Sequence, residues 1–82
     1  MGDLGAGNMD REEVLSLLRE LIRVFESLSS VPIVSITNDK ETGKWELLVN
    51  WVAGDQEKTT LSIIAAKHGS EVGEEEGYTV FR

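Results

Sequence analysis

Cysteine is absent from this 82-residue sequence, and histidine and proline occur once each, as His68 and Pro32. Without thiols the chain has no disulfide bonds, thiolate metal sites or cysteine nucleophiles. A chain without disulfides fits a reducing compartment, so we expect a cytoplasmic location. No apolar run is long enough to cross a bilayer as a helix. The N-terminus lacks the basic start and the apolar stretch of a secretory signal, so we expect none.

Basic residues are also scarce. The chain carries 15 acidic and 8 basic side chains, which gives a formal net charge of −7. An electrostatic field of this sign repels nucleic-acid phosphates and anionic membrane surfaces. We therefore expect no direct nucleic-acid binding and no membrane binding. At this length the chain forms one domain, which buries only about 60–65% of its unfolded surface and has a thin core.

The first nine residues contain three glycines and no periodic pattern. They predict a flexible leader over 1–9, followed by a single domain over 10–82. Asp10 begins a strong helix signal, in which it caps the helix and Glu13 reaches back to it. We expect this helix to end near Ser29 and Ser30, ahead of Pro32. Apolar residues recur along it every three or four positions and form a wide stripe: Val14, Leu15, Leu17, Leu18, Leu21, Ile22, Phe25 and Leu28.

After Pro32 the apolar pattern changes to alternation, which is typical of strands. We expect strands over 33–37, 45–52, 59–66 and 78–81, with turn residues between them and a glycine- and glutamate-rich loop before the last one. The sequence thus predicts an α+β fold of two layers. In this fold one N-terminal amphipathic helix packs on a three- to four-stranded antiparallel meander, in the order α-β-β-β-β.

The register of the second predicted hairpin follows from keeping its apolar residues on one side of the sheet. Pairing Val49 with Leu61 achieves this and leaves 54–56 as a three-residue loop. A two-residue loop sets Trp51 against Lys58 instead, and each polar group left unsatisfied in the core row costs about 1–3 kcal/mol. We therefore prefer the three-residue loop. The row that faces the helix then consists of Trp45, Leu47, Val49 and Trp51.

The opposite face of the predicted sheet is mostly polar but also holds apolar side chains that one helix on the other face cannot cover. Exposed apolar patches of this kind mark interaction surfaces. We therefore predict a protein-interaction site that consists of Leu48, Val52, Ile64, Lys58 and Asn50.

No pattern in the sequence predicts catalysis, a metal site or a cofactor, so we expect a protein that is not an enzyme. No spacing selects a nucleophile and a carboxylate for His68, which we interpret as an exposed turn residue. The acidic residues of 71–76 lack the ligand pattern of a calcium loop. They predict a solvated loop that discourages edge pairing of the last strand. We interpret Trp45 and Trp51 as core aromatics rather than as stacking platforms for a ligand.

Three functions stay open, and we rank them in this order. The first is a non-enzymatic protein-interaction domain that self-associates as a homodimer, or binds another protein, through the second sheet face. The second is an acidic inhibitor or antitoxin-like protein that occupies a basic site on its partner, which the net charge and the acidic cluster at 71–76 suggest. The third is a small enzyme or ligand carrier, for whose pocket a domain of this size has little room.

Overall fold

The computed structural model describes residues 9–82, so the leader predicted for residues 1–9 lies outside the described residues except at its last position. Met9 is only 3% exposed and packs in the core. Two helices and four strands follow along the chain: α1 (Arg11–Glu26), β1 (Val34–Asn38), β2 (Trp45–Val49), α2 (Asp55–Lys67), β3 (Val72–Glu75) and β4 (Tyr78–Phe81).

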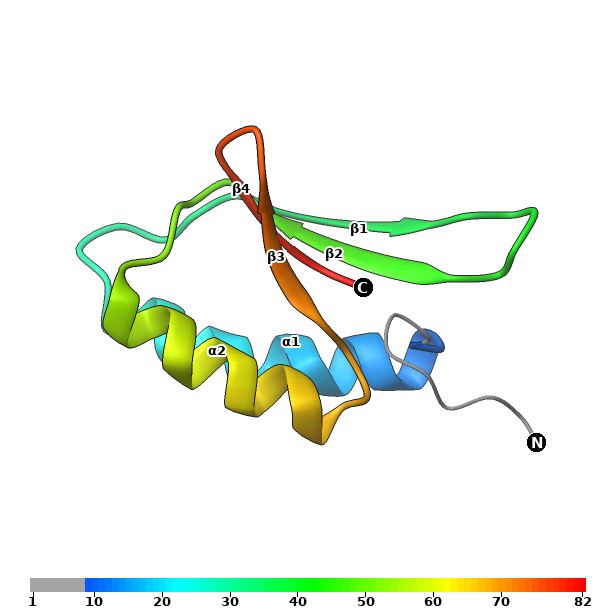
Figure 1. The fold of residues 1–82 in the computed structure, drawn as a ribbon, viewed down its shortest axis with the longest axis horizontal. Coiled ribbons are helices and arrows are strands. Elements are labelled where there is room, and N and C mark those ends of the chain that lie inside the picture. Colours follow the sequence, from blue (N-terminus) through cyan, green and yellow to red (C-terminus); the bar gives the residue numbers. More distant parts are fainter. Residues whose placement is uncertain (1–8) are drawn as a thin grey trace.

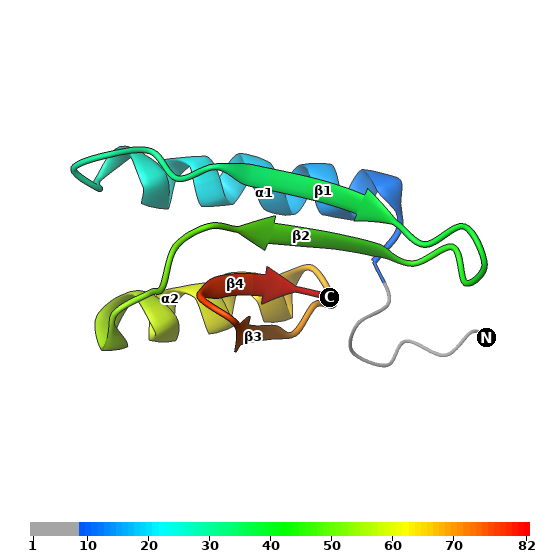
Figure 2. The ribbon, with the colours of Figure 1, turned by 90° about the horizontal axis from the view of Figure 1, so that it is seen from above.

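The domain has two layers, a four-stranded sheet and a pair of helices on one of its faces (Figure 1). The strands are ordered β1-β2-β4-β3, and all neighbouring strands are antiparallel. Seen from above the sheet, α1 runs along β1, while α2 lies on the side of β4 and β3 (Figure 2). The predicted α+β fold with an antiparallel sheet is therefore confirmed, and a second helix is added to it. Neither helix of residues 9–82 combines the length and the apolar character that a membrane span needs.

The first helix begins where the sequence predicts, although the Glu13 side chain binds His68 instead of reaching back to Asp10. The side chain of Asp10 caps it, because its Oδ1 accepts a hydrogen bond from the backbone N–H of Glu13 at 2.8 Å. Its buried side chains are spaced by three and four residues and face the sheet: Val14, Leu17, Leu21 and Phe25. The helix ends at Glu26, a few residues earlier than predicted. Ser27 follows as the C-cap, and its hydroxyl donates to the carbonyl of Val24 at 2.7 Å.

The strand predicted over 59–66 is wrong, since these residues lie within α2. The run Leu61–Ala65 contains apolar residues at alternate positions and also at helical spacing, and such short runs fit both periods. Tertiary packing selects the helical one, which buries Leu61, Ile64 and Ala65. The predicted pairing of Val49 with Leu61 is wrong for the same reason. The neighbours of β2 are instead β1 and β4, so that Val49 pairs with Val34 and with Thr79.

The loop predicted before the last strand is also partly wrong, because it contains β3. Glutamate disfavours strands by itself, but a tight turn pairs this segment with β4. Glu75 lies opposite Tyr78, which leaves Glu76 and Gly77 as a two-residue turn with φ of 50° and 85°. Two successive positive φ values are the signature of the type I′ hairpin turn.

The alternation predicted for β2 is confirmed where the strand exists. Leu47 and Val49 are fully buried against the helices, and Trp45 is half-buried on the same side. The strand ends at Val49, earlier than predicted. Trp51 lies beyond it and still packs on the core, with its ring edge-to-face against Phe25 at a centroid distance of 6.1 Å.

Candidate functional site

The five residues of the predicted interaction site do not share one surface. Leu48 lies on the sheet face that points away from the helices, and Asn50 follows directly after β2. Val52 is exposed in the connection to α2. Lys58 and Ile64 belong to α2 on the other side of the sheet, and Ile64 is part of the core. The predicted grouping depended on a strand over 59–66. These residues belong to α2 instead, so they do not extend the sheet face that carries Leu48.

The outer face of the sheet, opposite the helices, holds both apolar side chains and ion pairs, and Tyr78 on it is 39% exposed. Val80 pairs with Leu48 on this face and is only 2% exposed. The guanidinium group of Arg82 binds Glu46, with an Nε–Oε2 distance of 3.2 Å, and also binds Glu75. Along the hairpin, Arg82 and Glu75 lie on either side of Val80, so the Arg82 side chain passes over it. A partner at this face would first have to displace these ion pairs.

His68 lies where the end of α2 meets α1, and most of its side chain is covered. It caps the C-terminal end of α2, and its side chain is 11% exposed. Its Nδ1 lies 2.5 Å from Oε2 of Glu13, and its Nε2 lies 2.6 Å from Oε2 of Glu20. Lys67 adds a bond from its Nζ to Oε1 of Glu20 at 2.9 Å. His68 does lie in a turn as expected, but the expected exposure is wrong, because its side chain is largely covered and ties α2 to α1.

The charge of this cluster follows from its hydrogen bonds. A neutral imidazole has only one N–H, so two carboxylate partners require the protonated ring. Burial acts against the charged ring, but the hydrogen bonds to Glu13 and Glu20 outweigh it and raise the pKa of His68. The hydrogen bonds from Lys67 and then from His68 lower the pKa of Glu20. With both nitrogens engaged, His68 has no free nitrogen with which to act as a base, and the cluster is suited to holding two helices together.

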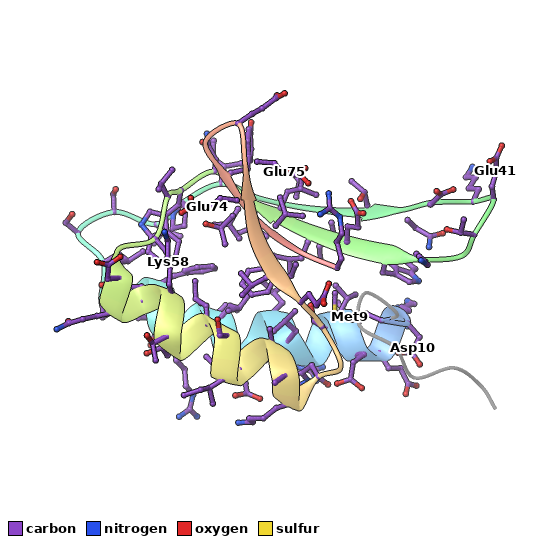
Figure 3. All side chains as sticks on the ribbon, viewed as in Figure 1. Met9, Asp10, Glu41, Lys58, Glu74 and Glu75 are labelled. Atoms are coloured by element: carbon purple, nitrogen blue, oxygen red, sulfur yellow. The ribbon has the colours of Figure 1, made fainter. Side chains whose placement is uncertain are left out.

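A hollow with a volume of about 260 Å³ lies between α2 and β3. Its lining is partly apolar, from Ala53, Leu61 and Val72. Lys58 on α2 and Glu74 on β3 form an ion pair across it, with an Nζ–Oε2 distance of 3.3 Å (Figure 3). The charged groups of the hollow therefore neutralise each other rather than converge on a ligand. Among residues 9–82 no cluster of histidine and acidic side chains has the arrangement of a metal site.

The open edge of β1 presents backbone hydrogen-bond donors and acceptors that have no partner strand. The backbone N–H of Asn50 donates to the carbonyl of Ile33, and that of Asp39 donates to the carbonyl of Lys44. In an antiparallel pair the bonded residues alternate with residues whose backbone groups point to the other side. The backbone N–H and C=O groups of Val34, Ile36 and Asn38 therefore point away from β2, toward solvent.

The two edges of the sheet differ in their protection. The edge strand β3 carries glutamates, and Glu74 faces the helices opposite Thr79. Inward-facing charges and charged edges prevent a sheet from pairing with further strands. The edge strand β1 has the sequence Val-Ser-Ile-Thr-Asn and contains no charged residue. The nearest charged residues along the chain lie in the hairpin turn that follows β1, where Glu41 points away from the domain (Figure 3). Of the two edges, β1 is therefore the one without charged residues that would oppose a further strand.

Apolar side chains lie beneath this open edge. Ile36 pairs with the buried Leu47, so it faces the helices, yet it is 37% exposed. On α1 the side toward α2 is occupied by Glu13 and Glu20, which bind His68. The opposite flank of α1 therefore lies on the side of β1, as Figure 2 shows. It carries Leu15 and Leu18, which are half-buried, and Ile22, which is 45% exposed.

We call this region the β1 edge surface and define it by the exposed backbone of β1 and five apolar side chains. Sequence reasoning missed it, although the strand predicted over 33–37 contains both Val34 and Ile36. The missing information was the second helix, because the predicted meander already placed this strand at an edge of the sheet. With α2 on the side of β4 and β3, α1 lies along β1 and its outer flank stays open (Figure 2). The side chains of the β1 edge surface are Leu15, Leu18, Ile22, Val34 and Ile36.

Comparison of the chain with protein-family models, with curated proteins and with solved structures finds no match. The function must therefore be argued from the geometry of the domain.

Proposed function

We propose that this domain is a non-enzymatic protein-interaction module that binds an extended strand of its partner along β1. The observation that carries the proposal is the β1 edge surface, in which outward backbone groups lie beside exposed apolar side chains. A partner strand hydrogen-bonds to the backbone, and its alternate side chains enter the space beside Ile36 and the flank of α1. Such binding gives affinity through the main chain and specificity through the apolar side chains.

This proposal moves the interaction surface from the outer sheet face, where the sequence suggested it, to the edge of the sheet. On the outer face Arg82 pairs with Glu46 and Glu75. The β1 edge has no such ion pairs, since Val34–Asn38 is uncharged. A cytoplasmic location belongs to the same proposal and is supported by the absence of cysteine from the chain.

The acidic inhibitor fits the geometry less well. Within the acidic cluster at 71–76, Glu74 pairs with Lys58 and Glu75 pairs with Arg82. These carboxylates are already partly neutralised by the chain itself. A basic partner would have to displace both cations, so the cluster gives less binding free energy than its composition suggests.

A photo-crosslinking residue at Thr37 tests the proposal in the cells that produce the protein. Thr37 is exposed in β1, so we expect a crosslinked protein adduct, and we expect Ile36→Lys in the same chain to abolish it. The same crosslinker at Gly73, on the opposite edge strand and facing open space, is the matched control and should give no such adduct. No adduct from Thr37, or the same adducts from both edges, would contradict the proposal.

A further inference from the structure

We infer that the strand that β1 accepts is β1 of a second copy, so that two chains form a symmetric dimer with a continuous eight-stranded sheet. This inference rests on the proposed function and names its partner. It follows from one symmetry operation, a two-fold axis perpendicular to the sheet beside Ile36. This single operation pairs the backbone groups of the two β1 strands, covers the apolar side chains of the β1 edge surface and brings opposite charges toward each other.

The strand β1 is complementary to itself. An antiparallel pair centred on Ile36 places Ile36 opposite its counterpart and Val34 opposite Asn38 of the other copy. These are the residues whose backbone groups point outward, so the new pairs are hydrogen-bonded ones. The two Ile36 side chains then meet on the helix side of the joined sheet, where each is 37% exposed in the single chain. Self-complementary surfaces of this kind produce closed dimers rather than filaments.

The flank of α1 is complementary to itself under the same operation. Each α1 is attached to its own β1, so antiparallel strands bring the two α1 flanks together in antiparallel orientation. Leu15, Leu18 and Ile22 line this flank at spacings of three and four residues. Their exposed surface in one chain is then covered by the same three side chains of the other. The dimer thereby removes from water the apolar side chains of the β1 edge surface.

The charges at the two ends of the flank also match. Arg11 continues the apolar stripe at the start of α1, and Glu26 continues it at the end. Both side chains are exposed, and neither forms an ion pair within residues 9–82. Antiparallel flanks bring Arg11 of each copy toward Glu26 of the other, which gives two symmetry-related attractive pairs. A parallel arrangement would bring like charges together, so the charge pattern favours the operation that the strands require.

Sedimentation equilibrium of the purified chain tests the inference directly. We expect the mass of a dimer for the unchanged chain and the mass of a monomer for Ile36→Lys. The dissociation constant of the Ile36→Lys dimer should rise about a hundredfold or more, because the dimer buries the new charge. Tyr78→Lys is the matched control. Tyr78 is exposed to almost the same degree, at 39%, but it lies on the outer face, so this variant should remain dimeric. Circular dichroism confirms that both variants fold.

Charge reversal at the flank provides an independent test. Arg11→Glu and Glu26→Arg each replace attraction by repulsion, so each variant alone should dissociate about tenfold more readily than the unchanged chain. An equimolar mixture of the two variants forms a heterodimer in which both pairs are attractive. We expect the mixture to recover the stability of the unchanged dimer, whereas each variant alone does not. A mixture no more stable than its components would overturn the antiparallel arrangement of the flanks.

The possible failures are distinguishable. A purified chain that stays monomeric at all concentrations, while Thr37 crosslinks to a different protein, rejects the second copy and retains the interaction function. A dimer that Tyr78→Lys dissociates and Ile36→Lys does not would place the interface on the outer face and reject both proposals. A dimer lost only with Ile36→Lys, together with a Thr37 adduct of twice the chain mass, supports both.

Discussion

Nε2 of His68 lies 2.6 Å from Oε2 of Glu20, and this contact, together with the one to Glu13, fixes the end of α2 to α1 in a charge-dependent way. The pKa of His68 is raised in the folded domain, whereas an unfolded chain titrates near the ordinary value of about 6.5. The folded state therefore holds the proton more tightly than the unfolded state. The resulting stabilisation is complete below the unfolded pKa and is lost as the pH rises through the folded pKa.

We accordingly expect the free energy of unfolding to decrease as the pH rises from about 6.5 through the raised pKa of His68 in the folded domain. Urea unfolding followed by tryptophan fluorescence at several pH values measures this decrease. His68→Gln is the control, since glutamine does not titrate and its stability should vary much less over the same range. Equal pH dependence of the two proteins would show that the ring is not held as a cation.

The turn between β3 and β4 predicts a stabilising substitution. Glu76 adopts a φ of 50°, in the left-handed region that favours asparagine and glycine over other residues. Glu76→Asn gives the Asn-Gly sequence that type I′ turns prefer, and we expect it to raise the free energy of unfolding by roughly 0.5–1 kcal/mol. Gly77 has a φ of 85°, so Gly77→Ala should lower it by about 1 kcal/mol or more. Urea midpoints of the two variants should therefore move in opposite directions.

The two faces of β2 predict different costs for neighbouring substitutions. Leu47 is fully buried against the helices, whereas Leu48 is half-buried on the outer face. Leu47→Ala should lower the free energy of unfolding by about 2–5 kcal/mol, enough to unfold a substantial fraction of a domain this small. Leu48→Ala should cost less than half as much. Similar losses from both substitutions, measured by urea unfolding, would contradict the assignment of the faces.

The sequence specifies local elements of this fold better than their arrangement. The first helix and its Asp10 cap are predictable because an apolar stripe and a capping residue act within one segment, whereas Pro32 placed the predicted end of the helix too late. The facing direction of Leu47 is predictable because alternation needs no knowledge of neighbours. The helix α2 is not, since its run from Leu61 to Ala65 fits both periods and only packing selects one.

The candidate site depends on the part of the fold that the sequence does not reveal. Ile36 lies on an edge strand in the predicted meander as well as in the structure, but the flank of α1 beside it stays open only because α2 covers the side of β4 and β3. His68 becomes a buried ion-pair residue only because α2 returns beside α1 and brings it to Glu13 and Glu20. Both relationships join residues far apart in the chain, and no local pattern contains them.

An intermolecular NMR measurement tests the pairing of β1 with its copy most directly. Ser35 and Thr37 direct their backbone N–H and C=O groups to β2, so their Hα atoms point to the open edge. In a dimer centred on Ile36, Hα of Ser35 lies opposite Hα of Thr37 in the other copy. A sample mixed from isotope-labelled and unlabelled chains should give an intermolecular nuclear Overhauser effect between these two protons. Its absence at concentrations where the chain sediments as a dimer would contradict the account.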